Sequence, residues 1–177
     1  MRNLIDILLF DFPALLLYLL IRLILVKRIK INLKKDILRI IFVIYISSLI
    51  FIFEVKHTFY TDNIYYNFIP FNTIINYLNS AQASTAVENI IRNIIITVPL
   101  GFFTFLKIRI FPKMNIFLYS LLIPFFVEAS QFSLHLLRLG TRSIDIDDIL
   151  LNATGILLGY FIARLNFISK KRQKVII

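Results

Sequence analysis

Five runs of mostly apolar residues constrain this chain more than any other feature of its sequence. A helix needs roughly 20 such residues to cross the hydrocarbon core of a bilayer, where only helices and closed barrels satisfy every backbone polar group. We therefore predict an all-α fold, a polytopic membrane bundle of five transmembrane helices in a single domain of residues 1–177. The predicted spans are residues 7–26, 37–55, 90–106, 116–134 and 149–168.

The composition agrees with a bilayer as the solvent. Hydrophobic residues make up 59% of the 177, which exceeds the share of about 45–50% that is typical of soluble domains. The net charge of +10 would suit nucleic acid, but the basic residues lie between the apolar runs, so we expect no nucleic-acid partner. The chain has no cysteine, which excludes disulfides and zinc sites built from cysteine.

Lysine and arginine are unevenly divided between the two sides of the predicted spans. Twelve follow the first, third and fifth spans, whereas four lie on the other side. Because cytoplasmic loops carry the excess of Lys and Arg, we predict an outer N-terminus and a cytoplasmic C-terminus. The twelve are Lys27, Arg28, Lys30, Lys34, Lys35, Lys107, Arg109, Lys113, Lys170, Lys171, Arg172 and Lys174, and the four are Arg2, Lys56, Arg138 and Arg142.

The longest predicted outer loop, residues 56–89, is rich in aromatic side chains in its first half. Aromatic residues concentrate where a membrane meets water, so we predict that this loop lies against the interface. Pro70 ends one element, and residues 73–79 follow with Ile74, Ile75 and Leu78 at helical spacing. This spacing predicts a short amphipathic helix in the head-group region.

Polar residues that are costly in a membrane gather at the outer ends of the last three spans. Intramembrane polar and ionisable residues commonly mark functional sites. Asp145, Asp148 and Asn152 lie three and four residues apart, and Gly155 and Gly159 continue the same spacing, which predicts one stripe along a helix. The candidate ligand-binding residues are Asn67, Arg92, Asn93, Glu128, Gln131, Arg142, Asp145, Asp148 and Asn152.

Several of these residues also have a purely structural interpretation. Gly155 and Gly159 form a small-xxx-small pattern, which we assign to helix packing. We interpret Asp147 as a solvated residue that adds negative charge to the start of its own helix. Glu128 and Arg142 could form a buried ion pair that is either structural or functional.

Four segments resemble the VanZ-like family of bacterial membrane proteins and occur in the order of its motifs. Together they span residues 67 to 159, and they read NFIPF at 67–71, NIIITVPLGF at 93–102, EASQ at 128–131 and RSIDIDDILLNATGILLG at 142–159. The resemblance implies a multi-pass protein of the bacterial cytoplasmic membrane. The founding member of the family confers low-level resistance to teicoplanin, a lipid-tailed glycopeptide. The family motifs carry over as candidate site residues to Asn67, Asn93, Glu128, Gln131, Arg142, Asp145, Asp148 and Asn152.

Three functions remain open from the sequence. The first is binding of a lipid-tailed ligand in the outer leaflet, either a glycopeptide or a cell-envelope lipid. The second is an intramembrane enzyme acting on a lipid-linked envelope substrate, with Glu128 as the candidate catalytic acid or base. In that enzyme Arg92 and Arg142 would hold a phosphate, and Asp145 and Asp148 could hold a divalent cation. The third is a scaffold for another membrane protein. We expect no other cofactor.

Overall fold

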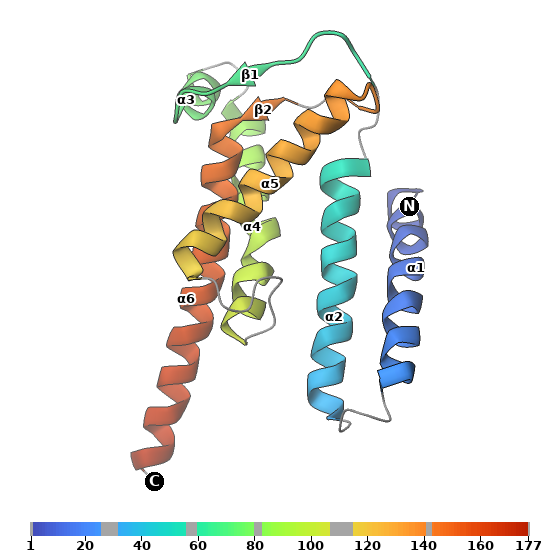
Figure 1. Ribbon diagram of the computed structural model, residues 1–177. Coiled ribbons are helices and arrows are strands. Elements are labelled where there is room, and N and C mark those ends of the chain that lie inside the picture. Colours follow the sequence, from blue (N-terminus) through green and yellow to red (C-terminus); the bar gives the residue numbers. More distant parts are fainter. Residues whose placement is uncertain are drawn as a thin grey trace. The chain divides into compact units, whose positions relative to one another are not determined.

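The chain is built almost entirely of helices (Figure 1), in a computed structural model that describes residues 2–25, 32–55, 60–79, 83–106, 115–140 and 143–176. Within these ranges five helices are long and apolar enough to cross a membrane. Each of them overlaps one of the predicted spans, so the predicted all-α membrane fold is confirmed. They are Asp6–Ile24, Leu33–Phe53, Val87–Phe105, Ile116–Leu136 and Ile146–Ile168.

The chain divides into two compact units, residues 1–58 and residues 59–177, which we call the N-terminal unit and the C-terminal unit. The N-terminal unit contains α1 (Arg2–Leu25), α2 (Leu33–Ile50) and the π-helical turn η1 (Phe51–Val55). The C-terminal unit contains β1 (Tyr66–Asn67), α3 (Asn72–Leu78), α4 (Ala83–Phe105), α5 (Ile116–Leu136), β2 (Ile144–Asp145) and α6 (Ile146–Ile176).

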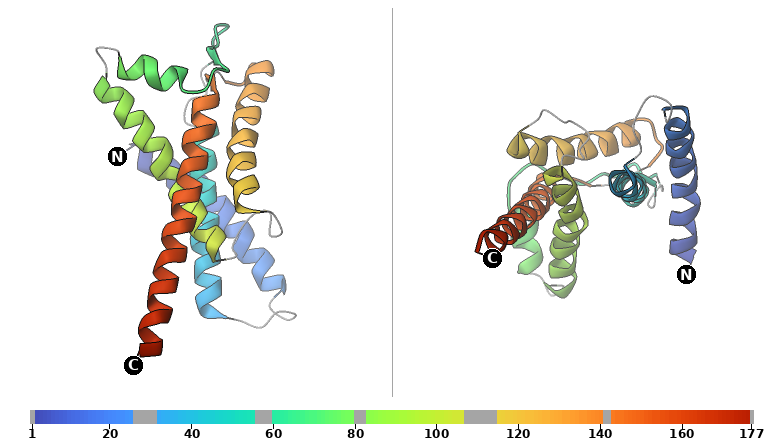
Figure 2. Two further views of the ribbon diagram at one scale, coloured as in Figure 1. Left: turned by 90° about the vertical axis from the view of Figure 1, so that its left-hand side faces the viewer. Right: turned by 90° about the horizontal axis from the view of Figure 1, so that it is seen from below.

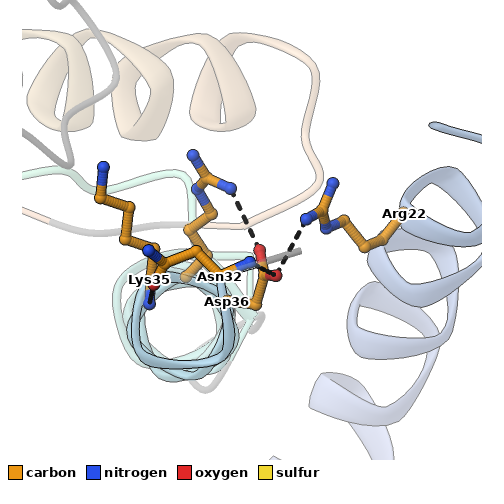
Figure 3. A network of polar contacts seen from close by, with 5 residues as sticks. Arg22, Asn32, Lys35 and Asp36 are labelled. Atoms are coloured by element: carbon orange, nitrogen blue, oxygen red, sulfur yellow. Dashed lines mark hydrogen bonds and ion pairs between the residues drawn. The ribbon is translucent and has the colours of Figure 1, made fainter. Parts of the chain in front are cut away.

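In the N-terminal unit, α1 and α2 are joined through polar side chains near both ends of the pair. Asp36 of α2 accepts hydrogen bonds from Arg22 at 2.9 Å and from Arg39 at 3.1 Å, and Figure 3 shows Arg22 reaching across from α1. Further along, Ser48 donates to a carboxylate oxygen of Asp11 at 2.7 Å. The two helices are therefore held by side-chain contacts at separate points.

Helix starts in both units follow from asparagine caps. Asn32 has an extended backbone and its side chain accepts the backbone N–H of Lys35, which begins α2 (Figure 3). Asn115 does the same for Phe117 at the start of α5. Such a cap satisfies one of the N–H groups that have no partner within the first turn of a helix.

In the C-terminal unit, α4 crosses α6 at very close range (Figure 2). Glycines on both helices make this approach possible, because a Cβ atom built on any of them would overlap the backbone of the other helix. Such a Cβ would lie 1.9 Å from Ile156 O at Gly101, 2.2 Å from Ile94 O at Gly155, and 1.9 Å from Val98 O at Gly159. The glycines on α6 thus pack against α4, and Gly101 is their counterpart on the opposite helix.

The short helix expected after Pro70 is present as α3, Asn72–Leu78. Phe71, immediately before it, has a φ of 66°. A non-glycine residue rarely adopts this left-handed conformation, and it persists only where surrounding contacts stabilise it. The contacts that do so come from the start of α6 and belong to the site described next.

Candidate functional site

The site is centred on a two-residue pairing between the loop before α3 and the start of α6. Strands β1 and β2 run parallel, with Tyr66 opposite Ile144 and Asn67 opposite Asp145, and they lie side by side in Figure 1. Ile144 N–H also donates to the carbonyl of Tyr65 at 2.9 Å. This pairing brings together residues 78 positions apart in the chain.

Around this pairing lies a set of carboxylate and amide side chains from β1, α4, α5, β2 and α6. Most of its members are buried, and they connect to one another through hydrogen bonds or through adjacent turns of one helix. We call this set the polar cluster, and its members are Asn67, Asn93, Glu128, Gln131, Asp145, Asp147, Asp148 and Asn152.

Asn67 connects the loop to α6. Its carboxamide nitrogen donates to Asp145 Oδ1 at 2.8 Å and to Thr73 Oγ1 at 2.9 Å. Its carbonyl oxygen accepts the backbone N–H of Ile69 at 3.1 Å and a hydrogen bond from Asn72 at 3.4 Å. Both donors and both acceptor positions of this side chain are therefore occupied. Asn67 holds the cluster together and has no hydrogen bond left to offer a ligand.

Asp147 caps a helix other than its own. Its two carboxylate oxygens accept the backbone N–H groups of Phe71, Thr73 and Ile74, at 2.5, 3.0 and 3.2 Å. The side chain is only 1% exposed, so the interpretation of Asp147 as a solvated residue at the start of α6 is wrong. An anionic acceptor is favourable at a helix N-terminus, and here it fixes the left-handed turn at Phe71 and the start of α3.

Glu128 and Gln131 contribute to the cluster from the last turns of α5. They are 6% and 5% exposed, respectively, and Glu128 Oε2 accepts the backbone N–H of Asp145 at 3.3 Å. The Oδ1 atom of Asp145 in turn accepts the backbone N–H of Asp147 at 2.9 Å. The start of α6 is thereby connected to α5 on one side and to the loop before α3 on the other.

The first turns of α6 contact α4 through polar groups. Asn93 donates to Asp148 Oδ1 at 2.5 Å, and Thr97 donates to the backbone carbonyl of Asn152 at 2.9 Å. Asp148, Asn152 and the glycines share the α4-facing side, as the spacing predicts. Asp145 does not belong to that helical stripe, because it lies in β2 and the helix begins only at Ile146.

The predicted cations are less well placed by the structure than the carboxylates. Arg92 is exposed on α4. Arg142 lies outside the described residues, so its pairing with Glu128 stays a prediction. Among the residues that the structure describes, no group of three or more His, Asp or Glu side chains is arranged to hold a metal ion.

A comparison with known protein families shows which family the chain belongs to. A family model described as VanZ/LLP1 matches residues 37–168, which is most of the chain. The chain belongs to the VanZ/LLP1 family. The match includes every member of the polar cluster and begins within α2, so α1 lies outside it. No curated protein and no solved structure matches the chain.

Membership of the VanZ/LLP1 family, together with the five apolar helices, makes the chain a VanZ-like multi-pass membrane protein. Sequence reasoning missed the role of two residues in this site. Thr97 bonds to the backbone of α6, and Asp147 holds α3. A threonine or a second aspartate carries no signal by itself, because each acts on a segment more than 50 residues away.

Proposed function

We propose that this VanZ-like protein binds a lipid-tailed ligand, either a cell-envelope lipid or a lipoglycopeptide such as teicoplanin, at the outer face of the bacterial cytoplasmic membrane. One observation carries the proposal. An exposed apolar segment lies directly beside a buried cluster of carboxylates and amides. Phe68, Ile69 and Phe71 are 70%, 67% and 57% exposed, while the neighbouring Asn67 is 3% exposed.

The exposed apolar segment and the polar cluster match the two parts of such a ligand, its apolar tail and its polar head group. The exposed aromatic and aliphatic side chains would contact an acyl tail or the lipid interface. The polar cluster would meet the head group, since a few fixed polar groups beside apolar surface give orientation and specificity in ligand sites. Asp147 and Asn67 hold the apolar segment against the cluster, so both surfaces occupy one end of the C-terminal unit.

The proposed outer position of the site depends on the excess of Lys and Arg on the opposite side. Labelling with a membrane-impermeant thiol reagent tests it cleanly, because the chain has no cysteine of its own. In intact cells we expect labelling of an Asn63→Cys variant and none of a Lys174→Cys variant. The reverse pattern would move the site to the cytoplasmic face.

Binding itself is tested by thermal shift of the purified protein in detergent against envelope lipids and teicoplanin. We expect at least one lipid-tailed compound to raise the melting temperature, because a ligand that binds only the folded state stabilises it. A cell lacking the gene, complemented with wild-type protein, should also differ from the uncomplemented cell in its sensitivity to teicoplanin. Absence of both effects would contradict the proposal.

A further inference from the structure

We propose that the head group bound by the polar cluster is a protonated primary amine, carried by a lipid, and that Asp148 and Asn152 accept its N–H groups. The inference rests on the proposed function and specifies the class of ligand. It comes from two separate observations: the charge of the cluster, and a buried carboxamide oxygen that has no hydrogen-bond partner.

The first observation is an excess of carboxylates that are paired with neutral donors. Asp145 accepts from the amide of Asn67 and from a backbone N–H, and Asp147 accepts only from backbone N–H groups. Neither forms an ion pair within the described part of the chain. Pairing of Glu128 with Arg142, as the sequence predicts, would still leave Asp145 and Asp147 without a cation among the described residues. A site of this kind attracts a positive charge, because buried carboxylates need a counter-charge.

The second observation is the side chain of Asn152. The residue is only 4% exposed and its carbonyl oxygen has no hydrogen-bond partner. A buried polar group left without a partner costs about 1–3 kcal/mol. An unsatisfied buried group in a native structure calls for an explanation, and a bound ligand is one that suits a residue of the polar cluster.

Helix geometry predicts that this side chain points toward the cluster. Asn152 lies four residues after Asp148, so the two share one face of α6. Side chains on an α-helix lean toward its N-terminus, which brings the Asn152 carboxamide toward the turn that carries Asp148. Asp148 is half-buried and is already oriented by Asn93. We therefore assign the acceptor site to this pair, at the N-terminal end of α6 where it meets α4.

An ammonium group fits these acceptors better than a metal ion or a quaternary amine. Its three N–H donors match single acceptors on different residues. A divalent cation needs several oxygens converging at short distance, and no metal-holding group of side chains occurs in the described ranges. A quaternary amine carries the charge but has no N–H to donate to Asn152.

The test compares three lipids with the same acyl chains: phosphatidylethanolamine, phosphatidylcholine and phosphatidylglycerol. Affinity for the purified protein in detergent is measured for each by thermal shift over a concentration series. We expect phosphatidylethanolamine to bind about tenfold or more tightly than the other two, because a hydrogen bond to a charged group contributes that much. Phosphatidylcholine separates the N–H donors from the charge, and phosphatidylglycerol removes the cation.

Two variants and a matched control locate the effect. Asp148→Asn keeps the shape and removes the charge, and Asn152→Leu removes the carboxamide at similar size. Both should lower affinity for phosphatidylethanolamine to the level of phosphatidylcholine. Asn152→Leu should also leave the lipid-free melting temperature unchanged or higher, because the buried carboxamide oxygen has no hydrogen bond to lose. Asn166→Leu, exposed on the same helix, should bind like wild type.

The outcomes separate this inference from the proposed function. Equal binding of all three lipids, or unchanged selectivity in Asn152→Leu, would overturn the amine assignment and leave the lipid-binding function standing. Tightest binding of phosphatidylglycerol would also overturn it, because the cluster would then act as a cationic site. If none of the three lipids binds but teicoplanin does, the amine-lipid inference fails alone. If nothing binds, both proposals fail.

Discussion

The N-terminal unit and the C-terminal unit differ in the contacts that hold the helices within each of them. Only 6% of the α1 span is buried, against 39% of the α6 span. In the N-terminal unit, side chains connect α1 to α2 through a hydrogen bond and an ion pair. In the C-terminal unit, backbone meets backbone at the glycines, and side chains bond to backbone groups of distant segments.

The difference shows which contacts specify structure inside a membrane. Lipid tails are as apolar as leucine, so helices gain little from burying apolar surface against each other, and close packing and hydrogen bonds decide their association. Backbone contacts permit one register only, whereas a side-chain ion pair tolerates small shifts. The family match begins within α2 and continues to the end of the last span of the C-terminal unit, so it leaves out α1. We therefore expect mutations to be most damaging where backbones touch.

The largest effect is expected for Gly159→Leu. Its Cβ alone would lie 1.9 Å from the carbonyl oxygen of Val98, so α4 and α6 must separate. Overpacking of a core commonly costs about 1–3 kcal/mol, and a clash with backbone falls at or beyond the upper end. We expect strong loss of folded protein, measured by its level in membranes and its melting temperature. Thr154→Leu, exposed on the same helix, is the control and should accumulate normally.

Asp147→Ala should have the next largest effect. It leaves the part-buried N–H groups of Phe71, Thr73 and Ile74 without their carboxylate acceptor. Each should cost no more than the about 1–3 kcal/mol of a fully buried donor. The loss should be local, because the glycine contacts remain. We expect a cysteine placed at Phe68 to react faster with a soluble thiol reagent in the Asp147→Ala background, with a modest fall in melting temperature. An unchanged rate would mean that α3 is held by other contacts.

Glu128→Gln should separate stability from function. Glutamine keeps the shape and can still accept the backbone N–H of Asp145, so the melting temperature should fall by only a few degrees. Charge and acid–base capacity are lost, so we expect loss of the effect on teicoplanin sensitivity. A stable variant with the full effect would remove Glu128 from the site. Loss of stability in step with the effect would make its role structural.

The smallest effect is expected for Asp36→Asn in the N-terminal unit. It weakens the contacts to Arg22 and Arg39, which lie near the ends of the two candidate spans, where we expect salt to screen them. We expect nearly unchanged protein levels, and a difference in melting temperature from wild type that shrinks as salt is raised. A loss as large as that of Asp147→Ala would show that the N-terminal unit is as tightly specified as the C-terminal unit.

Much of the fold was predictable because local patterns determine it. Hydrophobic length predicted all five spans, and helical spacing predicted α3 and the glycine face of α6. These features depend on residues within a few turns of one another. Asn93 and Asp148 were predicted at the same level of the membrane, and the structure joins them by a hydrogen bond.

The remaining features depend on contacts between distant segments. Asp145 continues the helical spacing of α6, but pairing with β1 makes it extended, so its place on the stripe was wrong. Asp147 has the spacing of a solvated residue in a first turn, and only the return of the loop at Phe71 buries it. No local pattern distinguishes these two aspartates from Asp148.

The pairing of β1 with β2 also has a consequence for the order of assembly during synthesis. Asn67 leaves the ribosome 78 residues before its partner Asp145, which is a delay of about 4 to 16 s at ordinary rates of translation. Throughout that interval α3 has no cap, and Gly101 on α4 has no helix to meet. α6, which is made after α3 and α4, is thus the helix that completes both the packing and the polar cluster, so a chain truncated before residue 144 would insert its earlier helices and still lack the complete cluster.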